Sequence, residues 1–143
     1  MDALWSLLFF AVLGGLWWLA HKIEPHYSSK DGSRFMANAQ EIIDGRPMGR
    51  MRETRVTVER SGLLHCSQKK IAKRNGADFM LVGTSPAPPR KLKVYLAHAV
   101  HDGMSTTATE LAIRVPENSR VVPVLDAILA EKALRQQQSP GTS

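Results

Sequence analysis

The amino-acid sequence predicts an α+β protein. An N-terminal transmembrane helix is followed by a small antiparallel sheet or partly open barrel and then by a C-terminal amphipathic helix. Three observations predict this order: an uncharged apolar run opens the chain, several short segments alternate apolar with polar residues, and the last ordered stretch repeats its apolar residues at helical spacing. The length of 143 residues leaves room for one anchor and one domain.

The apolar run Ala3–Ala20 carries no charged residue. As a helix, its roughly 18 residues would rise about 27 Å, close to the hydrocarbon thickness of a bilayer. Trp5 near one end, and Trp17 and Trp18 near the other, match the preference of indole rings for the membrane interface. We therefore expect a transmembrane anchor over residues 1–21.

A cleaved signal peptide is the competing interpretation of this run. Such a peptide begins with Lys or Arg and ends with small residues, but only Met1 and Asp2 precede the run, and a cut after Ala20 would place bulky Trp18 three residues before the cleaved bond. We expect the anchor to stay attached.

The charges that flank the anchor predict its orientation. No Lys or Arg precedes it, and the cations that follow it are Lys22, Lys30, Arg34, Arg46, Arg50 and Arg52. The positive-inside rule then places the N-terminus outside the cell membrane and the domain in the cytoplasm. The single cysteine, Cys66, excludes an intrachain disulfide and agrees with a reducing compartment.

Within the anchor, Ala11 and Gly15 stand four residues apart, a spacing that lets another helix approach closely. This pair predicts a helix-packing face and, through it, a membrane-protein partner.

A juxtamembrane linker over residues 22–32 precedes the domain, as Pro25 and the Ser, Asp and Gly residues indicate. Residues 33–43 fit either a short helix or a strand. One face of a helix would carry Phe35, Ala39, Ile42 and Ile43, and one side of a strand would carry Phe35, Ala37 and Ala39. We prefer the strand, which would form a hairpin with residues 52–59 through a turn at residues 44–47.

Further strands are expected at residues 52–59, 63–67, 78–84, 91–98 and 109–115. The alternating apolar sets that predict their faces are Thr54, Val56 and Val58; Leu92, Val94 and Leu96; and Leu111, Ile113 and Val115.

A helix over about residues 119–134 closes the domain. Asn118 and Ser119 are candidate N-caps, and Pro123 falls within the first turn. The apolar stripe consists of Val121, Leu125, Ile128 and Leu129. We place the domain at residues 33–135 and a polar, disordered tail at residues 136–143.

The order of these elements resembles that of bacterial pleckstrin-homology-like domains: five strands from 52–59 to 109–115, then the helix with Val121, Leu125 and Ile128. The whole chain is similar to small actinobacterial single-pass membrane proteins of unassigned function that join one anchor to such a domain. The resemblance implies a fold and no particular activity.

No set of residues predicts catalysis. His65 and Cys66 are adjacent on a strand and would point to opposite faces. His98, His101 and Asp102 have no second ligand cluster at metal-binding spacing. We expect neither an enzyme, nor a metal, nor a cofactor.

Two basic stretches are the candidate binding residues. The first consists of Lys69, Lys70, Lys73 and Arg74, and the second of Arg90, Lys91 and Lys93. With a formal net charge of +6, they predict contact with anionic lipid headgroups or with a protein partner, the other interpretation being an ordinary solvated surface. The first stretch contains no aromatic residue for base stacking, so we expect no nucleic-acid role.

These observations together predict a non-enzymatic, membrane-anchored interaction module at the cytoplasmic face. It would bind a protein partner or the anionic lipid surface. The alternative is an accessory subunit of a larger membrane complex, joined through the face formed by Ala11 and Gly15.

Overall fold

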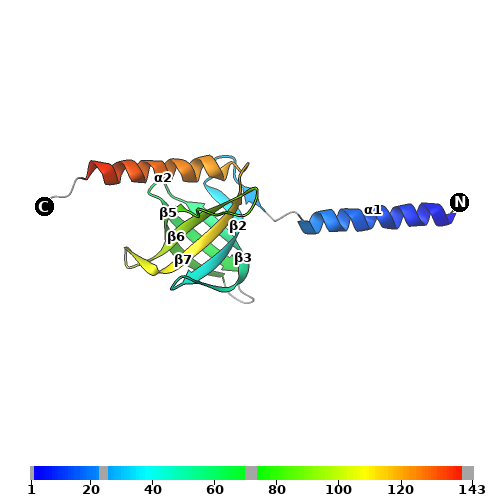
Figure 1. The fold of residues 1–143 in the computed structure, drawn as a ribbon, viewed down its shortest axis with the longest axis horizontal. Coiled ribbons are helices and arrows are strands. Elements are labelled where there is room, and N and C mark those ends of the chain that lie inside the picture. The colour runs from blue at the N-terminus through cyan, green and yellow to red at the C-terminus, as the bar shows by residue number, and fades with distance from the viewer. Residues whose placement is uncertain (1, 23–25, 70–73, 140–143) are drawn as a thin grey trace.

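The computed structural model describes residues 2–22, 26–69 and 74–139, with the side chains at positions 2, 21, 22, 69, 74 and 75 excepted. In chain order its elements are α1 (Asp2–Lys22), β1 (Tyr27–Ser28), β2 (Arg34–Ile43), β3 (Arg46–Val58), β4 (Leu63–Lys69), β5 (Arg74–Thr84), β6 (Leu92–His101), β7 (Met104–Pro116) and α2 (Val121–Gln138). The predicted α+β class and element order are confirmed, and residues 34–43 form a strand (Figure 1).

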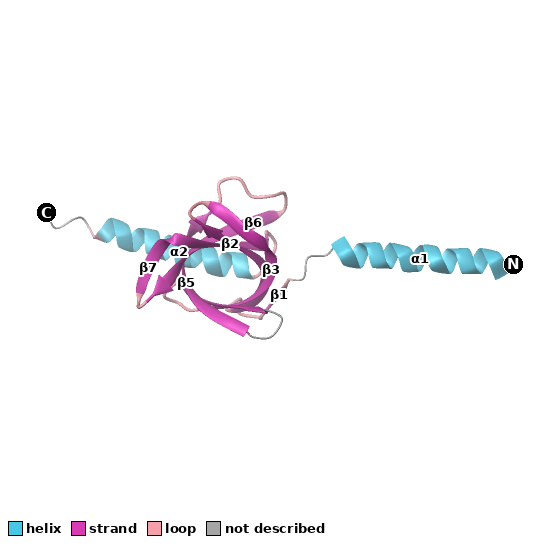
Figure 2. Ribbon diagram, turned by 90° about the horizontal axis from the view of Figure 1, so that it is seen from below, coloured by secondary structure: helices cyan, strands magenta, loops and turns pink. Residues whose placement is uncertain are grey.

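Strands β2 to β7 form a closed antiparallel barrel. Each strand pairs with the next along the chain, and β2 also pairs with β7, where Glu41 lies opposite Leu111. β2 pairs with β3 through its first half as predicted, with Phe35 opposite Val56. The short strand β1 joins the free side of β2 at Phe35 and Met36. Figure 2 looks into the resulting ring of strands, with α2 behind it.

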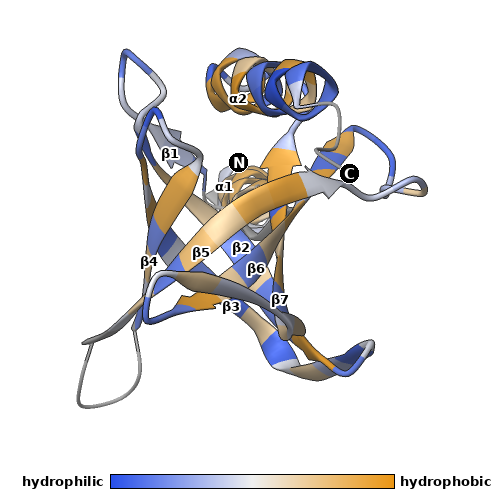
Figure 3. Cartoon of the chain, turned by 90° about the vertical axis from the view of Figure 1, so that its left-hand side faces the viewer, coloured by the Kyte–Doolittle hydropathy of each residue, from blue (hydrophilic) through white to orange (hydrophobic). Residues whose placement is uncertain are grey.

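The hydrophobic core fills the inside of this barrel and is closed at one end by α2. Val121 and Leu125 of α2 are fully buried, and Ile128 and Leu129 pack against the same core, which confirms the predicted stripe. Figure 3 shows α2 lying across that end. The other core side chains are Phe35, Ala37, Ala39, Val56, Leu64, Cys66, Phe79, Leu81, Tyr95, Ala97, Ala99, Leu111, Ile113 and Val115.

The side of β6 that faces the barrel core is the opposite of the one that the sequence pattern favoured. Leu92, Val94 and Leu96 do share a face, on which Val94 is buried and the other two are half-buried, but Tyr95 and Ala97 on the other face belong to the core cluster. Their cross-strand partners Ile113 and Leu111 are buried as well, as predicted. The pattern misled because the inward row of β6 begins with Lys93 and continues with a tyrosine and small alanines, and the larger aliphatic residues face outward.

Two hairpins are tighter than the sequence indicated. Ile43 pairs with Arg46 and His101 pairs with Met104, so each hairpin turns through two residues, Asp44–Gly45 and Asp102–Gly103. All four turn residues have positive φ, between 50° and 76°, as a type I′ turn requires. The expected turn at residues 44–47 was therefore too long, and residues 105–107, which fall between the expected strands 91–98 and 109–115, belong to β7.

A glycine lets the start of the domain pass close to α2. Gly32 has φ +72°, and a Cβ at this position would lie 2.8 Å from Val124 Cγ2 and 3.0 Å from the Arg120 carbonyl oxygen. Any larger residue would combine backbone strain with a steric clash. The segment predicted as a linker is thus built into the domain from β1 onward.

The two helices depart slightly from their expected ends. α1 includes Ala3–Ala20, a stretch with a mean hydropathy of 1.9 and no buried residue, so it is long and apolar enough to span a membrane. α2 runs to Gln138, so the expected disordered tail begins too early; residues 140–143 lie outside the described part. Ser119 lies just before α2 and accepts a hydrogen bond from the Val121 amide with its Oγ, 3.3 Å away.

Candidate binding site at the open end of the barrel

The two ends of the barrel differ in how they are closed. The β3–β4 turn, the β5–β6 loop and α2 lie at one end. The β2–β3 and β6–β7 turns, the end of β4 and the start of β5 lie at the other, because neighbouring strands alternate in direction (Figure 1). Among the residues that the structure describes, no helix covers this second end, which we call the open mouth.

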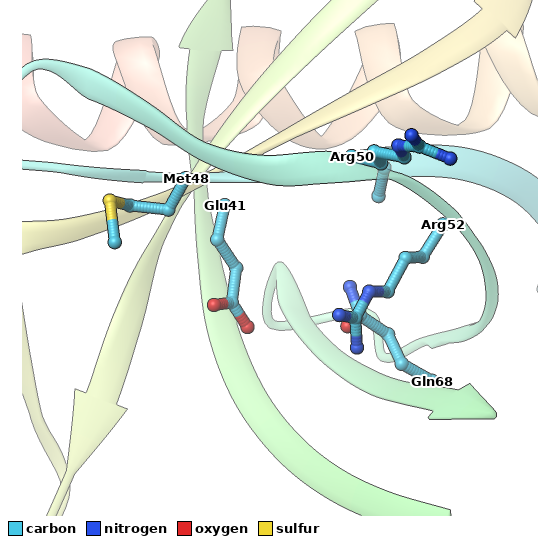
Figure 4. A pocket seen from close by; sticks show the side chains of 6 residues that line it. Glu41, Met48, Arg50, Arg52 and Gln68 are labelled. Carbon is cyan, nitrogen blue, oxygen red and sulfur yellow. The ribbon is translucent and has the colours of Figure 1, made fainter. Parts of the chain in front are cut away.

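The open mouth contains a hollow of about 80 Å³ lined by Ala39, Glu41, Met48, Arg50, Arg52 and Gln68 (Figure 4). A second hollow of about 320 Å³ shares Glu41 and Gln68 with it and is also lined by Cys66, Phe79 and Leu111. The two hollows therefore adjoin, and the polar rim borders apolar side chains of the core.

The strand register explains why polar side chains line this interior. Arg52 lies opposite Ala39, and Gln68 opposite Thr54, whose side chains are both buried inside the barrel. Glu41 lies opposite buried Leu111. Residues opposite one another project from the same face of a sheet, so these three polar side chains continue the inward row beyond the core.

The rim of the open mouth has an excess of positive charge. Arg50 and Arg52 are exposed, Glu41 is half-buried, and none of the three takes part in an ion pair within the described part of the chain. A guanidinium without a protein counterion offers its N–H donors to a carboxylate or phosphate oxygen, often in a bidentate arrangement. The arrangement is suited to holding an anionic group.

The described residues of the two predicted basic stretches lie at opposite ends of the barrel. Lys69 ends β4 and Arg74 begins β5, and the two pair across the hairpin at the open mouth. Lys70 and Lys73 lie outside the described residues, and the structure gives no side-chain position for Lys69 and Arg74. Arg90 is an exposed residue of the β5–β6 loop at the α2 end, so the two stretches do not form one surface.

In the second stretch, Lys91 is exposed, but Lys93 already forms an ion pair within the protein. The Lys93 Nζ lies 2.6 Å from Asp126 Oδ2 on α2, and the Tyr95 hydroxyl donates to Asp126 Oδ1 over 2.8 Å. Burial alone would raise the pKa of Asp126, but the hydrogen bonds from Lys93 and Tyr95 outweigh it and hold that pKa below its ordinary value. Lys93 thus fastens α2 to β6.

Cys66 and His65 do not form a catalytic pair. Cys66 points into the core, and its burial raises the pKa of the thiol to about 12. His65 points outward, with Nε2 2.7 Å from Glu59 Oε1 and Nδ1 2.5 Å from Asp78 Oδ1. These two hydrogen bonds raise the pKa of His65. The opposite directions predicted for the two side chains are confirmed.

The histidines near the β6–β7 hairpin likewise form no cluster. His98 Nε2 lies 3.0 Å from Glu110 Oε1 on the neighbouring strand, and His101 is exposed at the end of β6. Within residues 2–22, 26–69 and 74–139, no group of three His, Cys, Asp or Glu side chains is arranged to hold a metal ion.

The predicted helix-packing residues lie on a bare surface. Ala11 and Gly15 are exposed on α1, and a Cβ at Gly15 would meet no atom within 4 Å. The described chain therefore leaves this face of α1 open to another helix.

Sequence reasoning did not single out Arg50, Arg52, Glu41 and Gln68 as binding residues, although one signal was present. Arg52 is in phase with Thr54 and Val56, the row predicted to face inward, and Arg50 precedes it by one more step of two. Two arginines that continue a buried row of a strand indicate where the barrel core ends and its rim begins.

Comparison with protein-family models, with curated proteins and with solved structures finds no match to this chain.

Proposed function

We propose that this protein is a non-enzymatic interaction module, anchored in the cell membrane by α1, whose open mouth binds a carboxylate-bearing segment of a partner protein in the cytoplasm. The observation that carries the proposal is the pair Arg50 and Arg52, which line a hollow and take part in no ion pair in the described part of the chain.

The cytoplasmic side of the proposal is supported by charge. No Lys or Arg precedes the apolar run, whereas Lys22, Lys30 and Arg34 follow it closely. Under the positive-inside rule, this asymmetry orients the barrel toward the cytoplasm.

The short connection between α1 and the barrel indicates that the open mouth does not face the membrane that holds α1, so its partner is another molecule. Four peptide units separate Lys22, the end of α1, from His26, which is bound to Ser119 at the α2 end of the barrel; they span about 14 Å at most. The ten residues of β2 extend about 33 Å, or about 25 Å along the axis of a barrel with strands tilted by about 40°. If the open mouth faced the bilayer, the connection would have to extend along the barrel for about 25 Å, which is longer than its maximum of about 14 Å.

The chemistry of the mouth supports binding without catalysis. It offers guanidinium and amide donors, one carboxylate and a methionine. No aromatic side chain lines its rim within the described residues, so the base stacking typical of single-strand nucleic-acid binding has no platform there. An acidic peptide segment satisfies the donors directly.

An accessory subunit of a membrane complex is the second candidate function, and the bare face of α1 at Ala11 and Gly15 favours it. The two candidates differ in where the partner touches the chain. One predicts contact at the open mouth, and the other predicts contact within the membrane span.

Site-specific photo-crosslinking in cells separates them. A photoreactive amino acid at Met48, which is exposed beside the mouth, should capture a protein partner, and capture should be lost in the variant R50Q/R52Q and at raised salt. The variant R60Q/R120Q removes the same charge from exposed positions at the other end of the barrel and should leave capture intact. If the R50Q/R52Q variant captured the partner from Met48 as well as the wild type does, the proposed binding at the open mouth would be wrong. Capture only from Ala11 would favour the accessory subunit.

A further inference from the structure

A larger hollow, of about 500 Å³, lies on the outer face of the barrel over β1, β2 and β3, at the α2 end. It is separate from the open mouth and shares no lining residue with it. Its outward-facing lining consists of Tyr27, Ser29, Arg34, Met36, Arg55 and Thr57. We call this hollow the outer groove.

The strand register places two arginines side by side in the outer groove. Phe35 and Val56 point into the core, so their neighbours along each strand point outward. Met36 pairs with Arg55, and Arg34 pairs with Thr57, so Arg34 and Arg55 lie diagonally across adjacent strands. Diagonal neighbours lie within reach of one another through long side chains. Two guanidinium groups can therefore converge on one ligand.

No carboxylate in the described part of the protein forms an ion pair with either arginine. Neither Arg34 nor Arg55 belongs to an ion pair among the described residues, and nor does Glu53, two residues before Arg55 on the same face. Asp31 lies in the turn before β2, but its carboxylate accepts hydrogen bonds from Ser29 and Ser33 at 2.6 and 2.8 Å. These bonds lower the pKa of Asp31 to about 2, so its carboxylate is ionised, but among the described residues it forms no ion pair with Arg34 or Arg55.

The groove is also held close to the end of α1. Tyr27 follows His26 directly, and His26 is fixed at two points: its Nδ1 donates to the Met36 carbonyl oxygen over 3.0 Å, and its Nε2 lies 2.5 Å from Ser119 Oγ. The connection from Lys22 to His26 can reach about 14 Å at most, and the headgroup layer of a bilayer is about 5–8 Å deep, so the groove lies within reach of lipid headgroups. Tyr27 is 66% exposed, and an exposed tyrosine suits the boundary between water and acyl chains.

We propose that the outer groove binds the headgroup phosphate of an anionic phospholipid from the membrane that holds α1. Arg34 and Arg55 donate hydrogen bonds to the phosphate oxygens, and Tyr27 lies beside the glycerol backbone of the lipid. This inference rests on the proposed anchoring. It seats the α2 end of the barrel on the bilayer and leaves the open mouth facing the cytoplasm.

The two tyrosines of the chain provide the test, because Tyr27 is exposed and Tyr95 is fully buried. The full chain is labelled with fluorotyrosine and reconstituted in nanodiscs of phosphatidylcholine, with or without phosphatidylglycerol. Fluorine NMR then follows the broadening of each signal by a water-soluble gadolinium chelate. We expect Tyr27 to lose most of its broadening when phosphatidylglycerol is present, and Tyr95 to stay unbroadened throughout.

The variants decide whether the groove is responsible. R34Q/R55Q should abolish the protection of Tyr27, whereas R60Q/R120Q, which removes equal charge from exposed positions at the same end, should retain it. Inorganic phosphate without phosphatidylglycerol should not protect Tyr27. If broadening of Tyr95 shows that R34Q/R55Q unfolds, raised salt on the wild type must remove the protection instead.

Two results would overturn the inference: equal broadening of Tyr27 in both lipids, or equal loss of protection in both double variants. Failure of the anchoring proposal is recognised separately, because the chain would then not enter nanodiscs at all.

Discussion

At the scale of single residues, the contact that most clearly links strand and helix is made by Asp126. Its carboxylate receives Lys93 and the hydroxyl of Tyr95, a side chain that is otherwise inside the core. Without Asp126, that hydroxyl keeps only a long hydrogen bond of 3.4 Å to the Val122 carbonyl oxygen. Burial and the neighbouring Asp126 both raise the pKa of Tyr95, which stays a neutral donor.

We therefore expect Asp126→Ala to lower the free energy of unfolding by about 1 kcal/mol, a figure reduced because the ion pair is partly exposed to solvent. Since the folded state lowers the pKa of Asp126 below 3.8, this contribution is present above about pH 4 and is lost as pH falls further. Urea titrations of wild type and variant across this range provide the measurement. A difference that did not shrink in acid would contradict the assignment.

At the scale of elements, β6 provides the sharpest test of the fold. Ala97 is fully buried, whereas its neighbour Leu96 is half-buried on the outer face. We expect Ala97→Asp to cost at least about 3 kcal/mol, because it places an unpaired carboxylate in the core.

The matched change Leu96→Asp removes only outward apolar contacts and should cost about 1 kcal/mol. Thermal or urea unfolding of the two variants ranks them. A greater loss from Leu96→Asp would restore the face that the sequence pattern favoured and would contradict the register of β6 with β7.

At the scale of the whole molecule, the native thiol is a poor topology reporter, because Cys66 is buried and its pKa is about 12. An engineered cysteine at exposed Leu134 on α2, in a Cys66→Ala background, is a better one. We expect an impermeant maleimide to leave Leu134→Cys unlabelled in intact cells and to label it once the membrane is opened. Labelling of intact cells would place the barrel outside.

Much of the architecture follows from local chemistry, and the sequence by itself determined that part. An uncharged run of bilayer length, the alternation of Leu111, Ile113 and Val115, and the stripe of Val121 and Leu125 each depend on residues close together in the chain. The helices and strands, their order and the α+β class could be read from them. The opposite directions of His65 and Cys66 follow from the pleat of one strand.

Tertiary structure alone decided how the barrel closes and where its charges gather. Pairing of β2 with β7 joins residues about seventy positions apart, and no local pattern specifies it. In the folded barrel, Arg90 lies at one end and Lys69 at the other. Arg52 lines one hollow with Glu41 and Gln68 at the open mouth, and Lys93 pairs with Asp126. Whether a cation is available to a ligand depends on which strand lies opposite it. That neighbour is fixed by long-range register, which leaves only a faint trace in the sequence.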